Sequence, residues 1–253
     1  MASAWLEPTE DPVAMRAHKL ERRRSLGDAV YRVLPDGRAG AEELARSVLK
    51  HLGHDADLLS TAENDEALWL ASLAVHEDLV IMAPGAQGYG LVAASLCSPS
   101  HWRLPEKIGR PMARVHDPIP GIHEALTPRI DRIFENLRVE TPVDRYNWSV
   151  QPDNALFAWP EEHHEPIGVE TALWYRVERQ TLTRLPESGA LAFTIRVHLD
   201  PLESLLLQAG ALPALISAID ATPEDLKQYK TFDWLAPALD KYRTLADAHV
   251  GLV

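Results

Sequence analysis

The segment Cys97–Gly121 constrains this chain more than any other stretch, because it carries five prolines in a short span. Proline fixes the backbone angle φ and lacks an N–H donor, so the segment cannot be one long helix or a central strand. It also holds a tryptophan, two histidines and four basic residues. Long connections in compact domains commonly have a binding role. We expect an ordered loop that lines a site, and its cations and imidazoles suit a flat, anionic, metal-bearing ligand.

The composition is that of a globular protein and excludes several classes of function. Hydrophobic residues make up 46% of the 253 residues, and charged residues make up 25%. The formal net charge of −12 argues against a nucleic-acid partner, because binding to phosphates needs a basic face. A single cysteine, Cys97, excludes an internal disulfide and an iron–sulfur cluster held by this chain alone. We see no membrane-spanning run and no signal-peptide pattern, and we expect a cytoplasmic protein.

The spacing of apolar residues predicts a single compact domain with three parts. Residues 1–76 have the helical period, for example at Leu44, Val48 and Leu52. Residues 77–200 change to strand patterns with one amphipathic helix, which begins at Thr127-Pro128. Residues 201–253 return to helical spacing.

Strands are expected in two groups on either side of that amphipathic helix. The first group is a hairpin of Leu79–Ala83 and Tyr89–Leu96. The second group comprises three later strands: Arg145–Val150 with Leu156–Trp159, Leu173–Leu185 and Leu191–Leu199. The fold class is therefore α+β, with a five-stranded antiparallel sheet and helices over one face. This order of elements is similar to that of a Per-ARNT-Sim (PAS) sheet, whose ligand pocket lies between the sheet and the intervening helices.

Charged residues interrupt the long strand Leu173–Leu185. With a period of two, Arg176, Glu178 and Arg184 share one face, and Arg179 points to the other. Burial of an unpaired charge costs several kcal/mol, so these side chains must be paired or solvated. One interpretation is a structural lattice of salt bridges. The other is a polar pocket wall in which Glu178 holds a cationic substrate or moves a proton.

His116 is the first candidate for a metal ligand. It lies between Val115 and the sequence Asp117-Pro118-Ile119-Pro120, and the nearby prolines preset its backbone. The alternative is a buried histidine bonded to a carbonyl group. The cations around it either pair with carboxylates of a cofactor or are solvated surface charges: Arg103, Lys107, Arg110 and Arg114.

Several blocks of the sequence, all in order, resemble the family of the haem-dependent oxidative N-demethylase α subunit. They are His76–Leu79, Cys97–Trp102, Lys107–Pro111, Val115–Gly121, Arg145–Trp148, Arg176–Pro186 and Gly189–Arg196. The resemblance covers about residues 10–210. It implies a PAS-like domain that binds haem b. The sequence departs from the family at His76, in place of a usual glutamine, and at His198, where an aromatic residue is expected.

The resemblance also assigns roles to residues. His116 takes the position of the axial haem ligand, and His198 is the rival for that role. Other residues fall on pocket motifs or provide cations for the haem propionates: Arg103, Lys107, Arg114, Arg145, Trp148 and Arg179. Glu178 is assigned to the substrate ammonium or to proton delivery, with Arg176 as the donor beside it.

The implied function is a monooxygenase-like oxidoreductase. It would demethylate a small amine with O₂ and with electrons from a flavin and iron–sulfur partner. A C-terminal part shorter than expected leaves open whether tetrahydrofolate binds. The alternatives are a haem-based gas or redox sensor, a biosynthetic tailoring enzyme with another oxidative reaction, and a haem-carrier or structural subunit. The helical C-terminal pattern favours an enzyme over a sensor, because it has no extended coiled-coil heptads.

Overall fold

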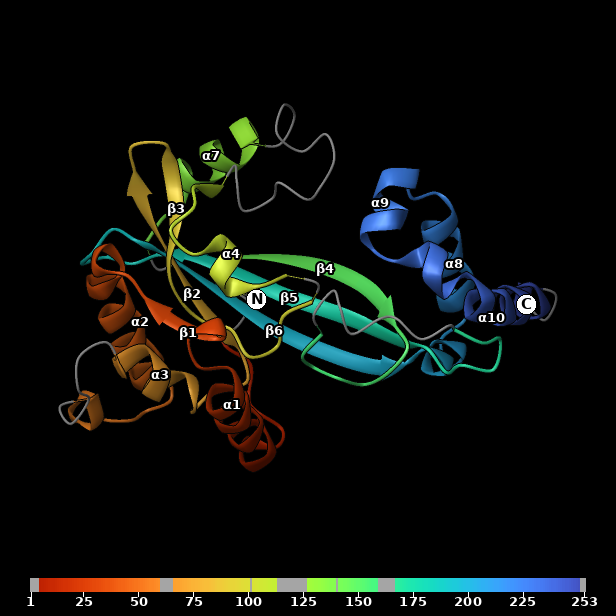
Figure 1. Ribbon diagram of the computed structural model, residues 1–253, viewed down its shortest axis with the longest axis horizontal. Coiled ribbons are helices and arrows are strands. Elements are labelled where there is room, and N and C mark those ends of the chain that lie inside the picture. Colours follow the sequence, from red (N-terminus) through yellow and green to blue (C-terminus); the bar gives the residue numbers. More distant parts are fainter. Residues whose placement is uncertain are drawn as a thin grey trace.

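The computed structural model describes residues 5–59, 66–100, 102–112, 127–139, 141–158 and 167–250. Within these ranges, one antiparallel sheet has the strand order β1-β3-β2-β6-β5-β4 (Figure 1). Its six strands are β1 Tyr31–Val33, β2 Asp78–Gly85, β3 Gly88–Ser95, β4 Val143–Gln151, β5 Trp174–Arg184 and β6 Leu191–Pro201. The predicted α+β class is confirmed.

The expected strand count of five was one too low. The additional strand, β1, is only three residues long and pairs with the edge of β3, from Tyr31 opposite Ser95 to Val33 opposite Ala93. So short a segment shows no readable alternation of apolar and polar residues. The piece expected at Leu156–Trp159 forms no strand over its described residues. There Ala158 makes only an isolated bridge to Ser100.

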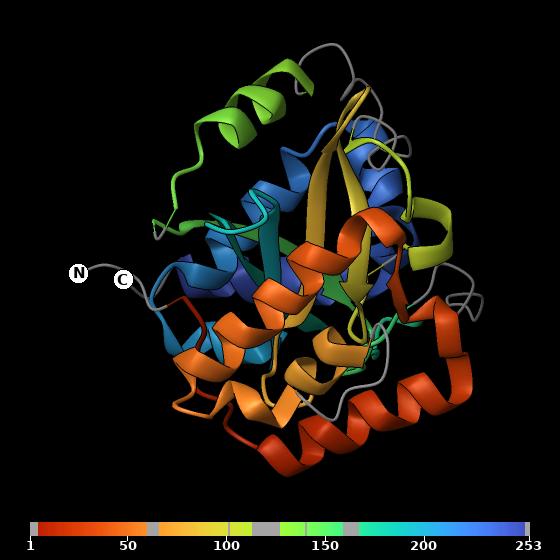
Figure 2. The same ribbon diagram turned by 90° about the vertical axis from the view of Figure 1, so that its left-hand side faces the viewer.

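The helices gather at the two ends and on the two faces of the sheet. They are α1 Pro12–Leu26, α2 Arg38–His51, α3 Ala67–Ser72, α4 Leu104–Lys107, α7 Thr127–Asn136, α8 Ala211–Asp220, α9 Glu224–Tyr229 and α10 Phe232–Val250. Figures 1 and 2 show α1, α2 and α3 at one end of the sheet, and α8, α9 and α10 at the other. In the part of the chain described here, we find no helix that combines the length and apolar character needed to cross a membrane.

Helices cover both faces of the sheet, whereas the sequence predicted helices over one face only. Successive residues of a strand point to opposite faces, so neighbouring residues of β2 contact different helices. Leu79 of β2 packs in one hydrophobic cluster with Leu44 of α2. Its neighbour Val80 points the other way and clusters with Leu104 of α4, while Met82 clusters with Phe134 of α7. We call these the α2–α3 face and the α4–α7 face.

The first helix begins and ends with clear local signals. The Asp11 side chain accepts a hydrogen bond from the backbone N–H of Ala14 at 2.9 Å, and Pro12 occupies the first turn. The helix ends at Gly27, whose positive φ of 51° favours glycine. Between these ends, α1 carries Lys19 into the protein, where its side chain is completely buried.

The C-terminal helices are docked on the far ends of β4 and β5. Val150 and Leu173 cluster there with Leu215 of α8 and Leu239 of α10. Tyr242 of α10 accepts a hydrogen bond from the Leu173 backbone N–H at 3.0 Å. This buried contact fixes α10 against the beginning of β5.

Candidate functional site

The charged residues of β5 divide between the two faces of the sheet, as the alternation predicts. Glu178 lies directly opposite Val197 of β6, and Gln180 lies opposite Ile195. Both β6 residues belong to the hydrophobic cluster of the α4–α7 face. Because opposite residues of antiparallel strands point to the same face, Arg176, Glu178 and Gln180 all lie on the α4–α7 face.

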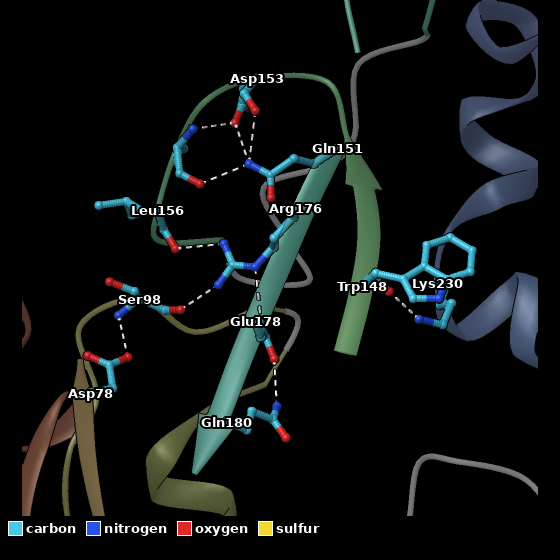
Figure 3. A network of polar contacts seen from close by, with 11 residues as sticks. Asp78, Ser98, Trp148, Gln151, Asp153, Leu156, Arg176, Glu178, Gln180 and Lys230 are labelled. Atoms are coloured by element: carbon cyan, nitrogen blue, oxygen red, sulfur yellow. Dashed lines mark hydrogen bonds and ion pairs between the residues drawn. The ribbon is translucent and has the colours of Figure 1, made fainter. Parts of the chain in front are cut away.

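Arg176 is the centre of a polar network on this face (Figure 3). Its side chain is completely buried, and its Nε donates to Glu178 Oε1 at 3.2 Å. One terminal nitrogen donates to the Leu156 carbonyl oxygen at 3.1 Å, and the other donates to that of Ser98 at 2.6 Å. Each nitrogen of the guanidinium group therefore has a partner within the protein. Arg176 joins two loops to β5 and fixes the position of Glu178.

The Glu178 carboxylate is held from two sides. Arg176 donates to one oxygen, and the Gln180 side-chain nitrogen donates to the other at 2.9 Å. The Glu178 side chain is 13% exposed. The remaining polar atom of the Gln180 amide, Oε1, is buried without a hydrogen-bond partner among the described residues. A carboxylate has about four acceptor sites, so Glu178 keeps capacity for a further donor.

Asp78 supports the same network from the other side of Ser98. Its two carboxylate oxygens accept the backbone N–H groups of Cys97 and Ser98, each at 2.8 Å. Burial raises the pKa of Asp78 to about 6, whereas Lys19 and these hydrogen bonds act in the opposite direction. Lys19 itself donates to the carbonyl oxygens of Ser72 and Glu77 at 2.9 and 2.6 Å. The loop after β3 is thereby bonded to β2, and through Arg176 to β5.

Two cations, Arg145 of β4 and Lys230 after α9, interact electrostatically with Glu178. Desolvation lowers the pKa values of Arg145 and Lys230, and the charge of Glu178 acts in the opposite direction on both. Arg145 lies opposite Gln180 and so shares the α4–α7 face. The Lys230 ammonium donates to the Trp148 carbonyl oxygen at 2.5 Å and lies 4.9 Å from the centre of the Trp148 ring. Figure 3 shows this contact beside β4.

Next to this polar row, the α4–α7 face is apolar. Val197 and Ile195 of β6 are buried there, together with Leu104 of α4. Five further hydrophobic residues pack against them and are only partly buried: Trp102, Ile108, Leu156, Phe193 and Leu199. The face therefore combines an apolar floor with a charged margin, an arrangement that suits an amphipathic ligand.

The predicted ligand His116 and the predicted cation Arg114 lie outside the described residues. The described residues on either side of that segment both pack on the α4–α7 face. Met112 before it joins the cluster of Met82, and Phe134 of α7 after it joins the same cluster. Arg184 bonds to α7 through the carbonyl oxygens of Phe134 and Leu137, at 2.6 and 2.9 Å. Of the other predicted cations, Arg103 precedes α4 and the buried Lys107 ends it.

Three predicted site residues lie on the opposite face. Arg179 and His198 project from the α2–α3 face, since they alternate with Glu178 and Val197. Arg179 forms ion pairs with Asp144 at 2.9 Å and with Glu7 at 3.6 Å, and His198 Nε2 lies 3.1 Å from a Glu7 oxygen. The Trp148 ring, predicted to line the pocket, instead stacks on Phe232 with centroids 5.9 Å apart.

Three residues near Glu178 were not predicted from the sequence as site residues: Gln180, Tyr229 and Lys230. The charge of Glu178 also acts on Tyr229. Burial raises the pKa of Tyr229, and the Glu178 charge adds a smaller increase. Tyr229 and Lys230 come from the C-terminal helical region, about 50 positions beyond Glu178 in the sequence, and no local pattern connects the two segments. Gln180 was recognisable in principle, since it continues the period of two from Arg176 and Glu178.

A comparison with protein families finds a match that covers most of this chain. The family model described as "Haem-dependent oxidative N-demethylase, alpha subunit-like" matches residues 49–239, about three quarters of the sequence. The matched range includes β2 to β6, the Arg176 network and Lys230.

Proposed function

This chain belongs to the haem-dependent oxidative N-demethylase α subunit-like family, and from that premise we propose that it binds haem b on the α4–α7 face. There it would oxidise a small amine with O₂ and with electrons from a partner reductase that carries flavin and iron–sulfur groups. The observation that carries the proposal is the Glu178 carboxylate, held by Arg176 and Gln180 at the margin of an apolar surface.

The residues of this face fit a haem in three respects. A porphyrin is a flat apolar group, and the partly buried side chains of Phe193, Ile108 and Trp102 provide apolar area for it. Its propionates need cations, which Arg145 and Lys230 would provide at the margin. The buried, unpartnered Oε1 atom of Gln180 also indicates that the described residues alone do not complete this part of the face.

His116 remains our candidate for the axial ligand. Within the strands that the structure describes, His198 is the only histidine, and its side chain lies on the opposite face from Glu178. The segment that holds His116 is flanked by residues packed on the Glu178 face, namely Met112 and Phe134. An imidazole nitrogen is a suitable iron ligand, and the packing of these two flanking residues supports the choice of His116 over His198.

When bound, the haem supplies the oxidative chemistry, and the side chains of the chain bind, orient and exclude water. We assign Glu178 to the ammonium group of the substrate or to delivery of a proton. Arg176 would keep the carboxylate oriented rather than act as a donor to the reacting groups, because its three nitrogens already have partners. The docked C-terminal helices favour this enzymatic role over that of a sensor, since α10 is bonded to β5 through Tyr242.

The proposal is tested by turnover of the haem-loaded protein with a reductant, O₂ and dimethylamine, with formaldehyde as the measured product. Glu178→Gln should keep the haem spectrum and lower turnover by about 10²-fold, the size of a lost charged contact in a desolvated site. Glu21→Gln is the matched control, because Glu21 forms an exposed ion pair with Arg24 on α1. Wild-type turnover in Glu178→Gln, or loss of haem from this variant, would contradict the proposal and indicate that Glu178 has a structural role.

A further inference from the structure

A cavity of about 410 Å³ opens at the free edge of β6, and Glu178 is not among the residues that line it. β2 begins at Asp78, opposite Ile195, so the second half of β6 extends beyond its neighbour on that side. The cavity occupies this position, between the start of α1 and the loop after β4. Its lining combines charged, imidazole and apolar groups: Glu10, His76, Asn154, Leu156, Trp174, Arg196, Val197, His198, Leu199 and Asp200.

Two buried nitrogens of the lining have no hydrogen-bond partner among the described residues. They are Nε of Arg196 and Nε2 of His76. The Arg196 side chain is only 3% exposed, and its terminal nitrogens donate to the backbone carbonyl oxygens of Glu7 and Pro8 at 3.5 and 3.1 Å. Buried polar atoms without partners are rare in folded proteins and indicate a ligand or solvent.

Burial and four nearby cationic or imidazole groups act together on His76. Desolvation, with smaller contributions from Arg196, Lys19, His198 and His18, lowers its pKa to about 3. His76 is therefore neutral at pH 7. Among the described residues of the lining, Arg196 is the only arginine or lysine, so its guanidinium group is the expected partner of an anion.

The Glu7 carboxylate forms ion pairs next to this cavity and shows which groups there bind an anion. Its carboxylate lies 3.1 Å from His198 Nε2, 3.6 Å from Arg179 Nε and 3.7 Å from Arg196 Nε. Arg179 and Arg196 are direct cross-strand partners, and Glu7 offsets the repulsion between them. The distance to Arg196 Nε is an ion-pair distance but too long for a hydrogen bond, so this N–H keeps its capacity for an acceptor.

We propose that this cavity binds a small free amino acid with an apolar side chain. Its carboxylate would accept from Arg196 Nε and His76 Nε2. Its apolar side chain would lie on Trp174 and Leu199. Its ammonium group would face the exposed carboxylates of Glu10 and Asp200, which form the acidic margin of the cavity.

The charged end of this cavity lies on the opposite face of the sheet from Glu178. Arg196 and His198 project from the α2–α3 face, whereas Glu178 projects from the α4–α7 face, because Val197 between them pairs with Glu178. Binding of the amino acid can therefore be measured without turnover. Haem content is recorded for each sample, so a protein without haem refutes the proposed function and leaves this measurement intact.

The test is isothermal titration calorimetry with three related probes on the full chain. L-Phenylalanine has both charges, 3-phenylpropionate lacks the ammonium group, and phenethylamine lacks the carboxylate. We expect L-phenylalanine to bind at least about tenfold more tightly than either of the others, because each charge contributes a charge-assisted hydrogen bond. Equal affinity for all three probes, or no heat of binding at millimolar concentration, overturns the proposal.

Variants assign the two ends of the probe. Asp200→Asn, at an exposed position, should weaken L-phenylalanine about threefold or more and leave 3-phenylpropionate unchanged. Arg196→Gln should weaken both by about tenfold. Glu7→Gln should tighten the binding of 3-phenylpropionate, because it removes a competing carboxylate from Arg196.

Asp36→Asn, at an exposed position distant in the sequence, is the control for these variants. If Arg196→Gln does not fold, the Asp200 and Glu7 variants decide, and unchanged affinities in both overturn the proposal.

Discussion

Asp78 and Arg176 hold the Ser98 backbone from opposite sides. The Asp78 carboxylate accepts the Ser98 N–H at 2.8 Å, and the Arg176 guanidinium donates to the Ser98 carbonyl oxygen at 2.6 Å (Figure 3). Both side chains are buried, so neither bond competes with solvent. Through this one residue, β2 is connected to the part of β5 that carries Glu178.

Loss of the Asp78 carboxylate should therefore destabilise the protein strongly. In Asp78→Asn, one acceptor oxygen is replaced by an NH₂ group that faces a backbone N–H, and a buried donor loses its partner. We expect the free energy of unfolding to fall by about 2–4 kcal/mol, measured by urea denaturation at pH 7.

Asp55→Asn is the matched control for that change. Asp55 also accepts a backbone N–H, from Asp57 at 3.0 Å, but does so in an exposed turn. Its substitution should change the free energy of unfolding by less than about 0.5 kcal/mol. Equal effects of the two substitutions would show that the Ser98 contact contributes little.

The burial of His76 predicts a loss of stability in acid. Its pKa is about 3 in the folded state, against 6.5 for the free side chain, so the unfolded state binds the proton first. This contribution is complete above pH 6.5 and is lost as the pH falls toward 3, at up to about 1.4 kcal/mol per pH unit.

His76→Gln should remove that part of the pH dependence. The free energy of unfolding of the variant and of the wild type, measured by urea denaturation from pH 7 to pH 4, should differ in slope over this interval. At pH 8 the imidazole is neutral in both states, so the difference there reports the packing cost alone. Parallel curves from pH 7 to pH 4 would contradict the assignment.

Lys230 should strengthen haem binding if the propionates lie beside it. Lys230→Gln removes the charge but keeps a polar side chain near Trp148, and we expect the dissociation constant for haem to rise by about tenfold. The position of the haem absorption band should not change, since Lys230 is not an iron ligand in this account. Titration of haem into the apoprotein measures both quantities.

Lys227→Gln, on helix α9 just before Lys230, is the control for that experiment. It removes the same charge three positions earlier and should leave haem affinity within about twofold of the wild type. An equal loss in both variants would indicate a general effect of surface charge. No loss in Lys230→Gln would place the propionates elsewhere.

Much of the sheet could be predicted from local sequence patterns. The hairpin of β2 and β3 and the long strands β5 and β6 follow clear alternation or continuous apolar runs, and their bounds differ from the expected ones by a few residues. The shared face of Arg176 and Glu178 also follows directly from the strand period. β1 was missed because three residues carry no period, and its pairing with β3 depends on a long-range contact.

The candidate site was less accessible to sequence analysis, because its parts meet only through tertiary packing. Arg179 was correctly predicted to point to the other face of the sheet from Glu178. Its partners Glu7 and Asp144, however, come from two distant segments of the sequence. The contact of Lys230 with Trp148 joins β4 to the residue after α9, and neither residue has a local signal for it. Burial of Arg176 likewise depends on two loops that close over it.

The most direct test of the central claim, that His116 holds haem on the Glu178 face, is the absorption spectrum of the protein purified with haem supplied. We predict a Soret band in the wild type that is shifted or lost in His116→Ala and retained in His198→Ala. A wild-type protein without a Soret band, or a band unaltered in His116→Ala, would contradict this account. Loss of the band in His198→Ala alone would place the haem on the α2–α3 face instead.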